Sequence, residues 1–238
     1  MTSNTTWTLS NSPYLITSNI TVVSGVTLTI QPGVVVKFDG NYQLQVNGAL
    51  NAHGTAGNEI VFTSNYATPG VSNWQHIYFT STSGASVLDS IRVEYSNYGI
   101  YMNGVSVPVS NSTIHKNYYG LLLVNGSSPN INGNIIQNNA HTGVRMESGS
   151  SPLIQNNDIG GNLYEGLLLY GPSTNPVNPV INNNAIYGHS YDNLWSGSVS
   201  GNQSGLKINA RNNWWGTNNI PFIIRTIRDY TEDVNAPV

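Results

Sequence analysis

The sequence predicts an all-β solenoid, in which short strands stack in parallel, coil upon coil. A largely apolar element that begins with glycine returns at steps of 21, 23 and 23 residues, and a related element follows 27 residues later. The copies are Gly99-Ile-Tyr-Met, Gly120-Leu-Leu-Leu, Gly143-Val-Arg-Met, Gly166-Leu-Leu-Leu and Asn193-Leu-Trp. In the same phase, apolar pairs five positions apart recur at Val109 and Ile114, Ile131 and Ile136, Ile154 and Ile159, and Ile181 and Ile186. Periods of this size are typical of solenoids, and helical periodicity is absent.

The repeated strands predict the core. Each coil holds strands of about three to five residues between turns of Gly, Asn, Ser and Pro. Because side chains alternate between the two faces of a strand, every second residue is expected to point into the core. The predicted inward residues are Ile100, Met102, Leu121, Leu123, Val144, Met146, Leu167 and Leu169.

A repeated polar corner follows the second apolar residue of each coil. Asn117, Asn139 and Asn162 occupy it, and His189 takes the same place in the next coil. Asparagine suits a left-handed turn, so these residues are predicted to be turn residues. Stacked asparagines can also hydrogen-bond from coil to coil as a ladder.

The chain is interpreted as one β-helix domain over residues 1–238. Residues 1–46 are predicted to form an N-terminal cap and the first coils, 47–205 the central coils, and 206–238 the last coil and a C-terminal cap. Residues 66–73 and 171–179 are predicted loop insertions. Trp214 and Trp215 are expected to close the last coil, with a carbohydrate platform as the lesser alternative.

Composition narrows the functional classes. Only 8% of the 238 residues are charged, so the surface must consist of uncharged polar residues. The net charge of −3 gives no basic surface, which argues against nucleic-acid binding. There is no cysteine, and no apolar run approaches a membrane span. The polar N-terminus lacks the regions of a signal peptide, and Met1 is expected to be an added start on a mature or truncated segment.

Two blocks of sequence resemble a known superfamily. The first is Val26-Thr-Leu-Thr-Ile-Gln-Pro-Gly-Val-Val-Val-Lys-Phe, continued by Val46-Asn-Gly-Ala-Leu-Asn-Ala-His-Gly-Thr and Ile60-Val-Phe-Thr; the second is Asn212-Asn-Trp-Trp-Gly-Thr. They are similar to the opening and the ending of secreted proteins in the right-handed parallel β-helix, or pectin-lyase-like, superfamily. The resemblance implies a right-handed parallel β-helix with N- and C-terminal caps, secreted or at the cell surface. It does not imply one function, because this fold carries lyases, hydrolases, epimerases, adhesins and surface-layer proteins.

The sequence offers no catalytic residue with a recognisable motif. Enzymes of this superfamily use clustered acids, often with calcium, or an arginine or lysine base, whereas the acids here are few and scattered. The nearest approach to a catalytic set is Arg145, Glu147, His141, Glu165 and Asp192. Glu165 and Asp192 both precede a coil start, so they are expected to stack about 5 Å apart, as a solvated corner pair or as part of a site. The five histidines lack metal-binding spacing, and neither a metal nor a cofactor is predicted.

The outward side of the repeated strand is the predicted binding surface, here called the outward stripe. It comprises Tyr78, Tyr101, Leu122, Arg145, Glu147, Leu168, Tyr170 and Trp195. A soluble monomer seldom leaves such an apolar and aromatic stripe bare. Three explanations remain open: the chain's own tail or an insertion covers it, another copy packs on it, or it binds a glycan.

The favoured hypothesis is a non-catalytic extracellular module with a structural, adhesive or self-assembling role, in which copies could stack end to end as a filament. The alternative is a carbohydrate-binding module or a polysaccharide lyase or hydrolase that uses the outward stripe, with Arg145 and Glu147 as polar anchors. The expected partners are other copies of the chain or a surface polysaccharide. Ice binding is a third hypothesis with less support, because the threonine pair Thr27 and Thr29 is not continued in later coils.

Overall fold

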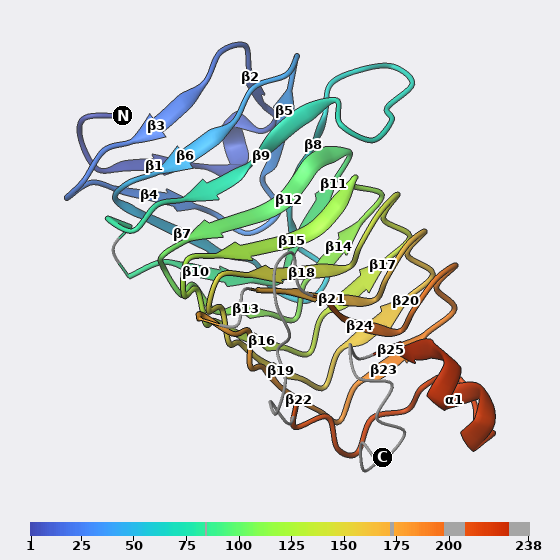
Figure 1. Cartoon of the computed structure of the whole chain (residues 1–238). Helices are drawn as coiled ribbons and strands as arrows, with labels where there is room; N and C mark the ends of the chain where they lie inside the picture. Colours follow the sequence, from blue (N-terminus) through green and yellow to red (C-terminus); the bar gives the residue numbers. More distant parts are fainter. Residues whose placement is uncertain (84, 172–173, 198–207, 229–238) are drawn as a thin grey trace.

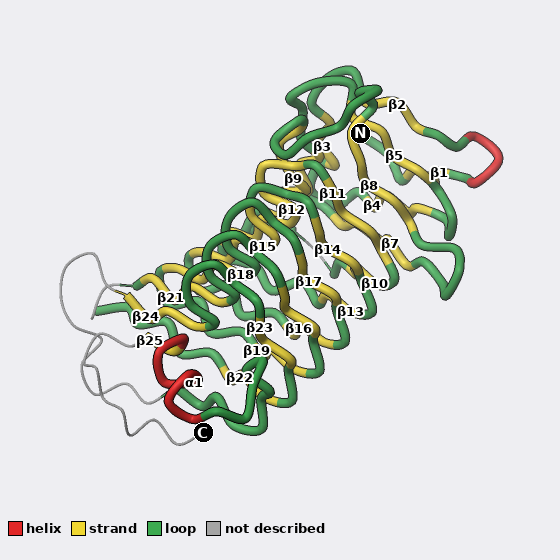
Figure 2. The backbone as a smooth tube through the Cα atoms, turned by 90° about the vertical axis from the view of Figure 1, so that its right-hand side faces the viewer, coloured by secondary structure: helices red, strands yellow, loops and turns green. Residues whose placement is uncertain are grey.

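The computed structural model describes residues 1–83, 85–171, 174–197 and 208–228. In these residues the chain winds into eight coils of three strands each (Figure 1). Corresponding strands of successive coils pair in parallel and form three long sheets, here called A, B and C. Figure 2 shows the coils stacked along one axis, with β1 and β25 at opposite ends of the stack. The predicted all-β solenoid is confirmed.

From β1 to β24, each sheet takes every third strand of the chain, and β25 then pairs directly with β24. Sheet A holds β1 (Thr5–Trp7), β4 (Thr27–Ile30), β7 (Ala49–His53), β10 (Val87–Asp89), β13 (Val109–Ser110), β16 (Asn130–Asn132), β19 (Leu153–Gln155) and β22 (Val180–Asn182). Sheet B holds β2 (Tyr14–Ile16), β5 (Val35–Phe38), β8 (Ile60–Ser64), β11 (Ile91–Glu94), β14 (Thr113–His115), β17 (Ile135–Gln137), β20 (Asp158–Gly160) and β23 (Ala185–Tyr187).

Sheet C contains the glycine-led repeats. It holds β3 (Ile20–Val22), β6 (Leu44–Val46), β9 (Trp74–Phe79), β12 (Ser96–Asn103), β15 (Tyr119–Val124), β18 (Val144–Glu147), β21 (Leu167–Tyr170), β24 (Leu194–Gly197) and β25 (Ile227–Arg228). The register pairs Ile100 with Leu121, Leu121 with Val144, and Val144 with Leu167. All eight residues predicted to point inward are fully buried. The phase set by the glycines therefore assigned inside and outside correctly.

The corner between sheets B and C carries the predicted asparagine ladder. The side-chain oxygen of Asn139 accepts the backbone N–H of Asn117 at 3.0 Å, and that of Asn162 accepts the backbone N–H of Asn139 at 3.1 Å. These asparagines are buried. The left-handed conformation predicted for them is wrong, because the residue before each takes it: Lys116 and Asn138 both have φ of 55°. The preceding residue turns the chain, which leaves the asparagine side chain free to bond inward.

A second ladder, missed at the sequence level, lies at the corner between sheets A and B. The backbone N–H of each member donates to the side-chain oxygen one coil further on, at 2.9–3.0 Å. Its members are Ser112, Asn134, Asn157, Asn184 and Asn213. Their signal was present in the sequence, since Asn134, Asn157 and Asn184 each stand three residues after the first apolar residue of a coil.

His189 continues the first ladder, and we expect it to make folding sensitive to acid. Its Nδ1 accepts the backbone N–H of Asn162 at 3.2 Å, which requires an unprotonated nitrogen. Burial lowers the pKa of His189 from 6.5 to about 4. Between pH 6.5 and pH 4, His189 is therefore protonated in the unfolded chain but not in the folded chain. The contribution of His189 to stability is complete above pH 6.5. The free energy of unfolding should fall by on the order of 3 kcal/mol as pH is lowered to 4.

Urea unfolding of the wild type and of His189→Asn between pH 4 and 7.5 measures this effect. Asparagine restores the regular ladder residue, so the variant should lose stability less steeply as pH falls. Burial also lowers the pKa of His76 to about 4, so part of the acid sensitivity should remain in the variant. Equal pH slopes for both proteins would contradict the prediction.

The two ends of the stack are closed differently. At the N-terminal end Trp7 is buried and stacks on Tyr14 at 4.8 Å. Strand β1 ends at Trp7, and a 3-10 turn, η1 (Leu9–Asn11), follows. At the C-terminal end β25 pairs with β24, and helix α1 (Ile220–Thr226) directs Ile223 into the core.

The two tryptophans near the C-terminal end separate. Trp215 is buried in the core, as predicted. Trp214 does not enter the core: 47% of it is exposed, and its ring contacts that of Tyr187. The backbone of Trp214 nevertheless bridges to Ala185, so the segment still adds to sheet B. No helix in the described part of the chain is both long and apolar enough to cross a membrane.

Candidate ligand-binding face

The outward stripe forms the predicted row on sheet C. Register pairs Tyr78 with Tyr101, Tyr101 with Leu122, and Leu122 with Arg145; Arg145 pairs in turn with Leu168, and Leu168 with Trp195. Leu122 and Leu168 are buried, because only 7% of Leu122 and 4% of Leu168 is exposed. Strand alternation fixes only the direction in which a side chain points. Its burial also depends on the side chains of adjoining coils, about 4.8 Å away. The hypothesis that the chain's own tail or an insertion covers the stripe concerns in part residues 172–173, 198–207 and 229–238, which lie outside the described residues.

Arg145 is held within the stripe. Its Nε donates to the carboxylate of Glu147 at 2.5 Å, and its Nη1 donates to the hydroxyl of Tyr119 at 3.2 Å. The guanidinium also lies 5.5 Å from the ring centres of Tyr119 and Tyr170. Burial alone would lower the pKa of Arg145, but Glu147 and Tyr119 raise it, and the net shift is upward. Arg145 is thus a cation with its charge paired, and its contacts link three successive coils.

A row of stacked rings runs beside the stripe, at the edge where the strands of sheet C begin. The sequence interpretation missed it, although His141, Tyr164 and Tyr191 each stand two residues before a coil start. The His141 and Tyr164 rings stack at 4.0 Å, and the Tyr164 and Tyr191 rings at 4.9 Å. Tyr119 and Tyr98 extend the row toward the N-terminal end. Most of these ring faces are occupied by neighbouring rings, so they stabilise the stack rather than offer stacking surfaces.

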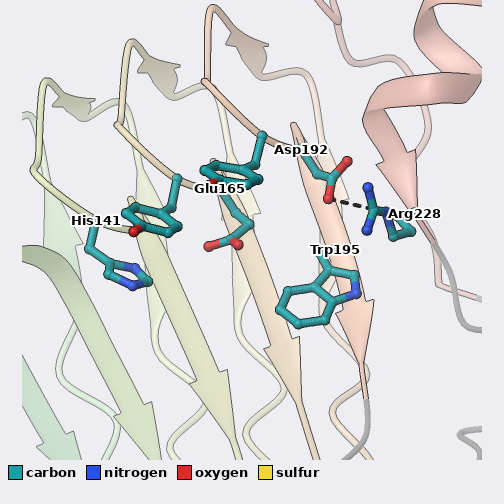
Figure 3. A pocket seen from close by; sticks show the side chains of 7 residues that line it. His141, Glu165, Asp192, Trp195 and Arg228 are labelled. Atoms are coloured by element: carbon teal, nitrogen blue, oxygen red, sulfur yellow. Dashed lines mark ion pairs between the residues drawn. The ribbon is translucent and has the colours of Figure 1, made fainter.

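A shallow hollow lies at the C-terminal end of this row (Figure 3). We call it the acidic hollow; it is lined by His141, Tyr164, Glu165, Tyr191, Asp192, Trp195 and Arg228. Its volume of about 380 Å³ is at the lower end of the range for ligand pockets. Glu165 and Asp192, which precede the coil starts of β21 and β24, come from neighbouring coils. Only 6% of Glu165 and 5% of Asp192 is exposed, so the interpretation as a solvated corner pair is wrong.

Each carboxylate of the acidic hollow has one neighbour that holds it. The hydroxyl of Thr142 donates to Glu165 Oε2 at 2.7 Å. Arg228 Nε lies 3.4 Å from Asp192 Oδ2, as the dashed line in Figure 3 marks. Burial raises the pKa of Asp192, and the charge of Glu165 raises it further, while Arg228 opposes both. Burial lowers the pKa of His141 although Glu165 opposes that shift, so His141 is neutral at pH 7 and does not balance the carboxylates.

Among the described residues, two rings at the hollow keep a side that no other ring covers. Tyr191 is the last ring of the row; 58% of it is exposed, and among the described residues no further ring covers its other side. Trp195 lies over Gly197, where an added Cβ would come within 3.0 Å of the indole. The indole therefore packs close to the backbone at Gly197 and lines the hollow together with the carboxylates (Figure 3). Flat aromatic faces beside buried carboxylates suit a ligand with an apolar side and polar substituents.

The predicted catalytic set is divided by the structure. His141, Glu165 and Asp192 all line the acidic hollow, whereas Arg145 and Glu147 pair with each other on the stripe. Across residues 1–83, 85–171, 174–197 and 208–228, no three histidine or acidic side chains converge as a metal site would require. Two histidines contact acids elsewhere in the described residues: His53 Nδ1 lies 3.0 Å from Asp89 on sheet A, and His115 Nε2 lies 2.9 Å from Glu94 on sheet B.

Comparisons with known proteins agree with the architecture. A model for a right-handed β-helix region matches residues 71–221, and one for a pectate-lyase-like β-helix domain matches residues 1–86. A stretch of 55 residues is 46% identical to part of Protein bark beetle from Drosophila melanogaster. This stretch covers 23% of the chain but only 2% of that relative. No solved structure matches the chain. Because the first model covers more than half of the sequence, the chain belongs to the right-handed β-helix family.

Proposed function

We propose that this chain is a non-catalytic, adhesive β-helix module that works outside the cell or at its surface and binds a carbohydrate at the acidic hollow. The aromatic rings of Tyr191 and Trp195 beside the hollow carry the proposal. Sugar rings have apolar faces that pack on aromatic rings, and hydroxyl groups that donate to carboxylates. The rigid stack of coils holds both kinds of contact in fixed positions without a ligand, which favours binding.

The remainder of the sheet C face supports a binding rather than a catalytic role. Arg145 and Glu147 neutralise each other at 2.5 Å, so neither is poised as a base or acid. In the part of the chain that the structure describes, no cluster suited to a calcium ion accompanies the carboxylates. The surface presents few charges, as suits a display scaffold with uncharged polar coils.

One observation favours a second candidate, a polysaccharide hydrolase. Glu165 and Asp192 belong to neighbouring coils, which are about 4.8 Å apart, and retaining glycosidases place two carboxyl groups about 5–5.5 Å apart. Burial raises the pKa of Asp192, as a general acid requires. Release of reducing ends from a panel of polysaccharides, abolished in Asp192→Asn, would establish this candidate and overturn the non-catalytic proposal.

Glycan binding gives the direct test of the proposed function. Wild-type protein is expected to bind a subset of glycans on an array, and Trp195→Ala to weaken that binding about tenfold, the loss typical of an aromatic anchor. Trp214→Ala is the matched control, because Trp214 is 47% exposed but lies on the sheet B side, outside the hollow. Equal losses in both variants, or no bound glycan for the wild type, would contradict the proposal.

Self-association remains a hypothesis with its own measurement. Among the described residues β1 and β2 each pair with one strand only, so the N-terminal end presents two open edges, whereas Met1 hydrogen-bonds along the edge of β3. Sedimentation at rising concentration would show filaments or dimers if copies stack on these edges. A monomer at all concentrations would exclude the self-assembling role without affecting glycan binding.

A further inference from the structure

The acidic hollow has an unbalanced charge. Among the residues that the structure describes, two buried carboxylates, Glu165 and Asp192, line the hollow with one cation, Arg228. His141 is neutral at pH 7 because burial lowers its pKa. The cation is also loosely held: 63% of the Arg228 side chain is exposed, against 7% for Asp192, and their contact is 3.4 Å long. Buried carboxylates are costly unless a cation or donor compensates them, so the hollow favours a further positive charge.

The geometry fits a compact cation. Glu165 and Asp192 come from neighbouring coils, whose backbones lie about 4.8 Å apart, and both line the same hollow, so one ammonium group there can donate to both carboxylates. Figure 3 shows the Glu165 carboxylate directed into the hollow, between His141 and Trp195. Aromatic faces attract cations as well as sugar rings, and Trp195 and Tyr191 supply such faces at the rim.

We infer that the acidic hollow selects an amino sugar, whose ammonium group lies between Glu165 and Asp192 while its ring packs on Trp195. This inference rests on the proposed function, because it names the class of carbohydrate that the same site takes. Arg228 then acts as the chain's own competing cation at Asp192. The ammonium group displaces the weak contact of Arg228 and keeps Asp192 ionised.

Three tetrasaccharides of equal length test the inference by calorimetry: β-1,4-linked glucosamine, its N-acetylated form and the glucose equivalent. The glucosamine tetramer should bind at least about tenfold more tightly than the other two, because only it carries ammonium groups. If all three bind equally, the inference fails and the proposed function stands. If none binds, both fail. Lysine amide is the fourth ligand, and binding as tight as that of the tetramer would overturn the role of the sugar ring.

Paired variants separate this inference from a structural role. Glu165→Gln should remove the preference for the glucosamine tetramer, because it keeps the size of the side chain and loses the charge. Arg228→Gln should raise affinity for the same tetramer severalfold, since it removes the competing cation. Glu147→Gln is the control, because its carboxylate pairs with Arg145 outside the hollow. Weaker binding in Arg228→Gln, or the same loss in Glu147→Gln, would overturn the inference.

Discussion

Replacing Asn139 with alanine is expected to lower the free energy of unfolding by about 3–4 kcal/mol. The Asn139 side chain accepts the backbone N–H of Asn117 at 3.0 Å and donates to the backbone carbonyl of Ile114 at 3.3 Å. It also donates to the side chain of Asn162 at 2.8 Å. Only 1% of Asn139 is exposed, so water cannot replace these bonds. Each buried backbone group left without its partner costs about 1–3 kcal/mol.

Urea unfolding followed by far-UV circular dichroism measures this loss. Asn138→Gly is the matched control, because Asn138 is the exposed neighbour in the left-handed conformation, which glycine adopts without strain. Its free energy of unfolding should stay within about 0.5 kcal/mol of the wild type. A similar loss in both variants would show that the turn, and not the ladder, stabilises this corner.

Replacing Gly120 with alanine is expected to cost about 3 kcal/mol, the upper end for overpacking a tight site. An added Cβ would lie 2.4 Å from the carbonyl oxygen of Gly143 in the next coil and 3.1 Å from Asn139 Nδ2. Neither atom can withdraw easily, because one belongs to the paired backbone and the other to the ladder. Gly99 and Gly143 meet the next coil in the same way.

Gly70→Ala provides the control for this prediction. Gly70 lies in the exposed loop before β9, and nothing stands within 4 Å of a Cβ added there. Thermal or urea unfolding should show this control within about 0.5 kcal/mol of the wild type. An alanine at position 120 that is tolerated equally well would mean that successive coils do not approach as closely at sheet C as the structure indicates.

The inward residues were predictable because two local rules suffice for them. Side chains alternate along a strand, and coils of nearly equal length stack in register, so Leu121 and Leu167 had to share one face. The ladder at Asn117 and Asn139 was predictable for the same reason. Its backbone conformation was not, because the residue that takes the left-handed turn depends on where the asparagine side chain must bond.

The candidate site could be predicted only in part. The sequence placed Glu165 and Asp192 in adjacent coils, but their burial depends on side chains that pack beside them in space. Arg228 reaches Asp192 only because β25 adds to the edge of sheet C after a long excursion of the chain. The place of Trp195 at the hollow likewise depends on its packing over Gly197, which no spacing rule contains.

The sequence by itself determined the solenoid, its phase, its core residues and the row in which the outward stripe lies. The tertiary structure alone decided which members of that row are buried, which rings stack on one another, and where two carboxylates and a cation line one hollow. The physical reason is the range of the forces involved. Strand alternation and coil period act within one coil and are written in consecutive residues, whereas burial and charge pairing depend on neighbours from other coils and from the C-terminal segment.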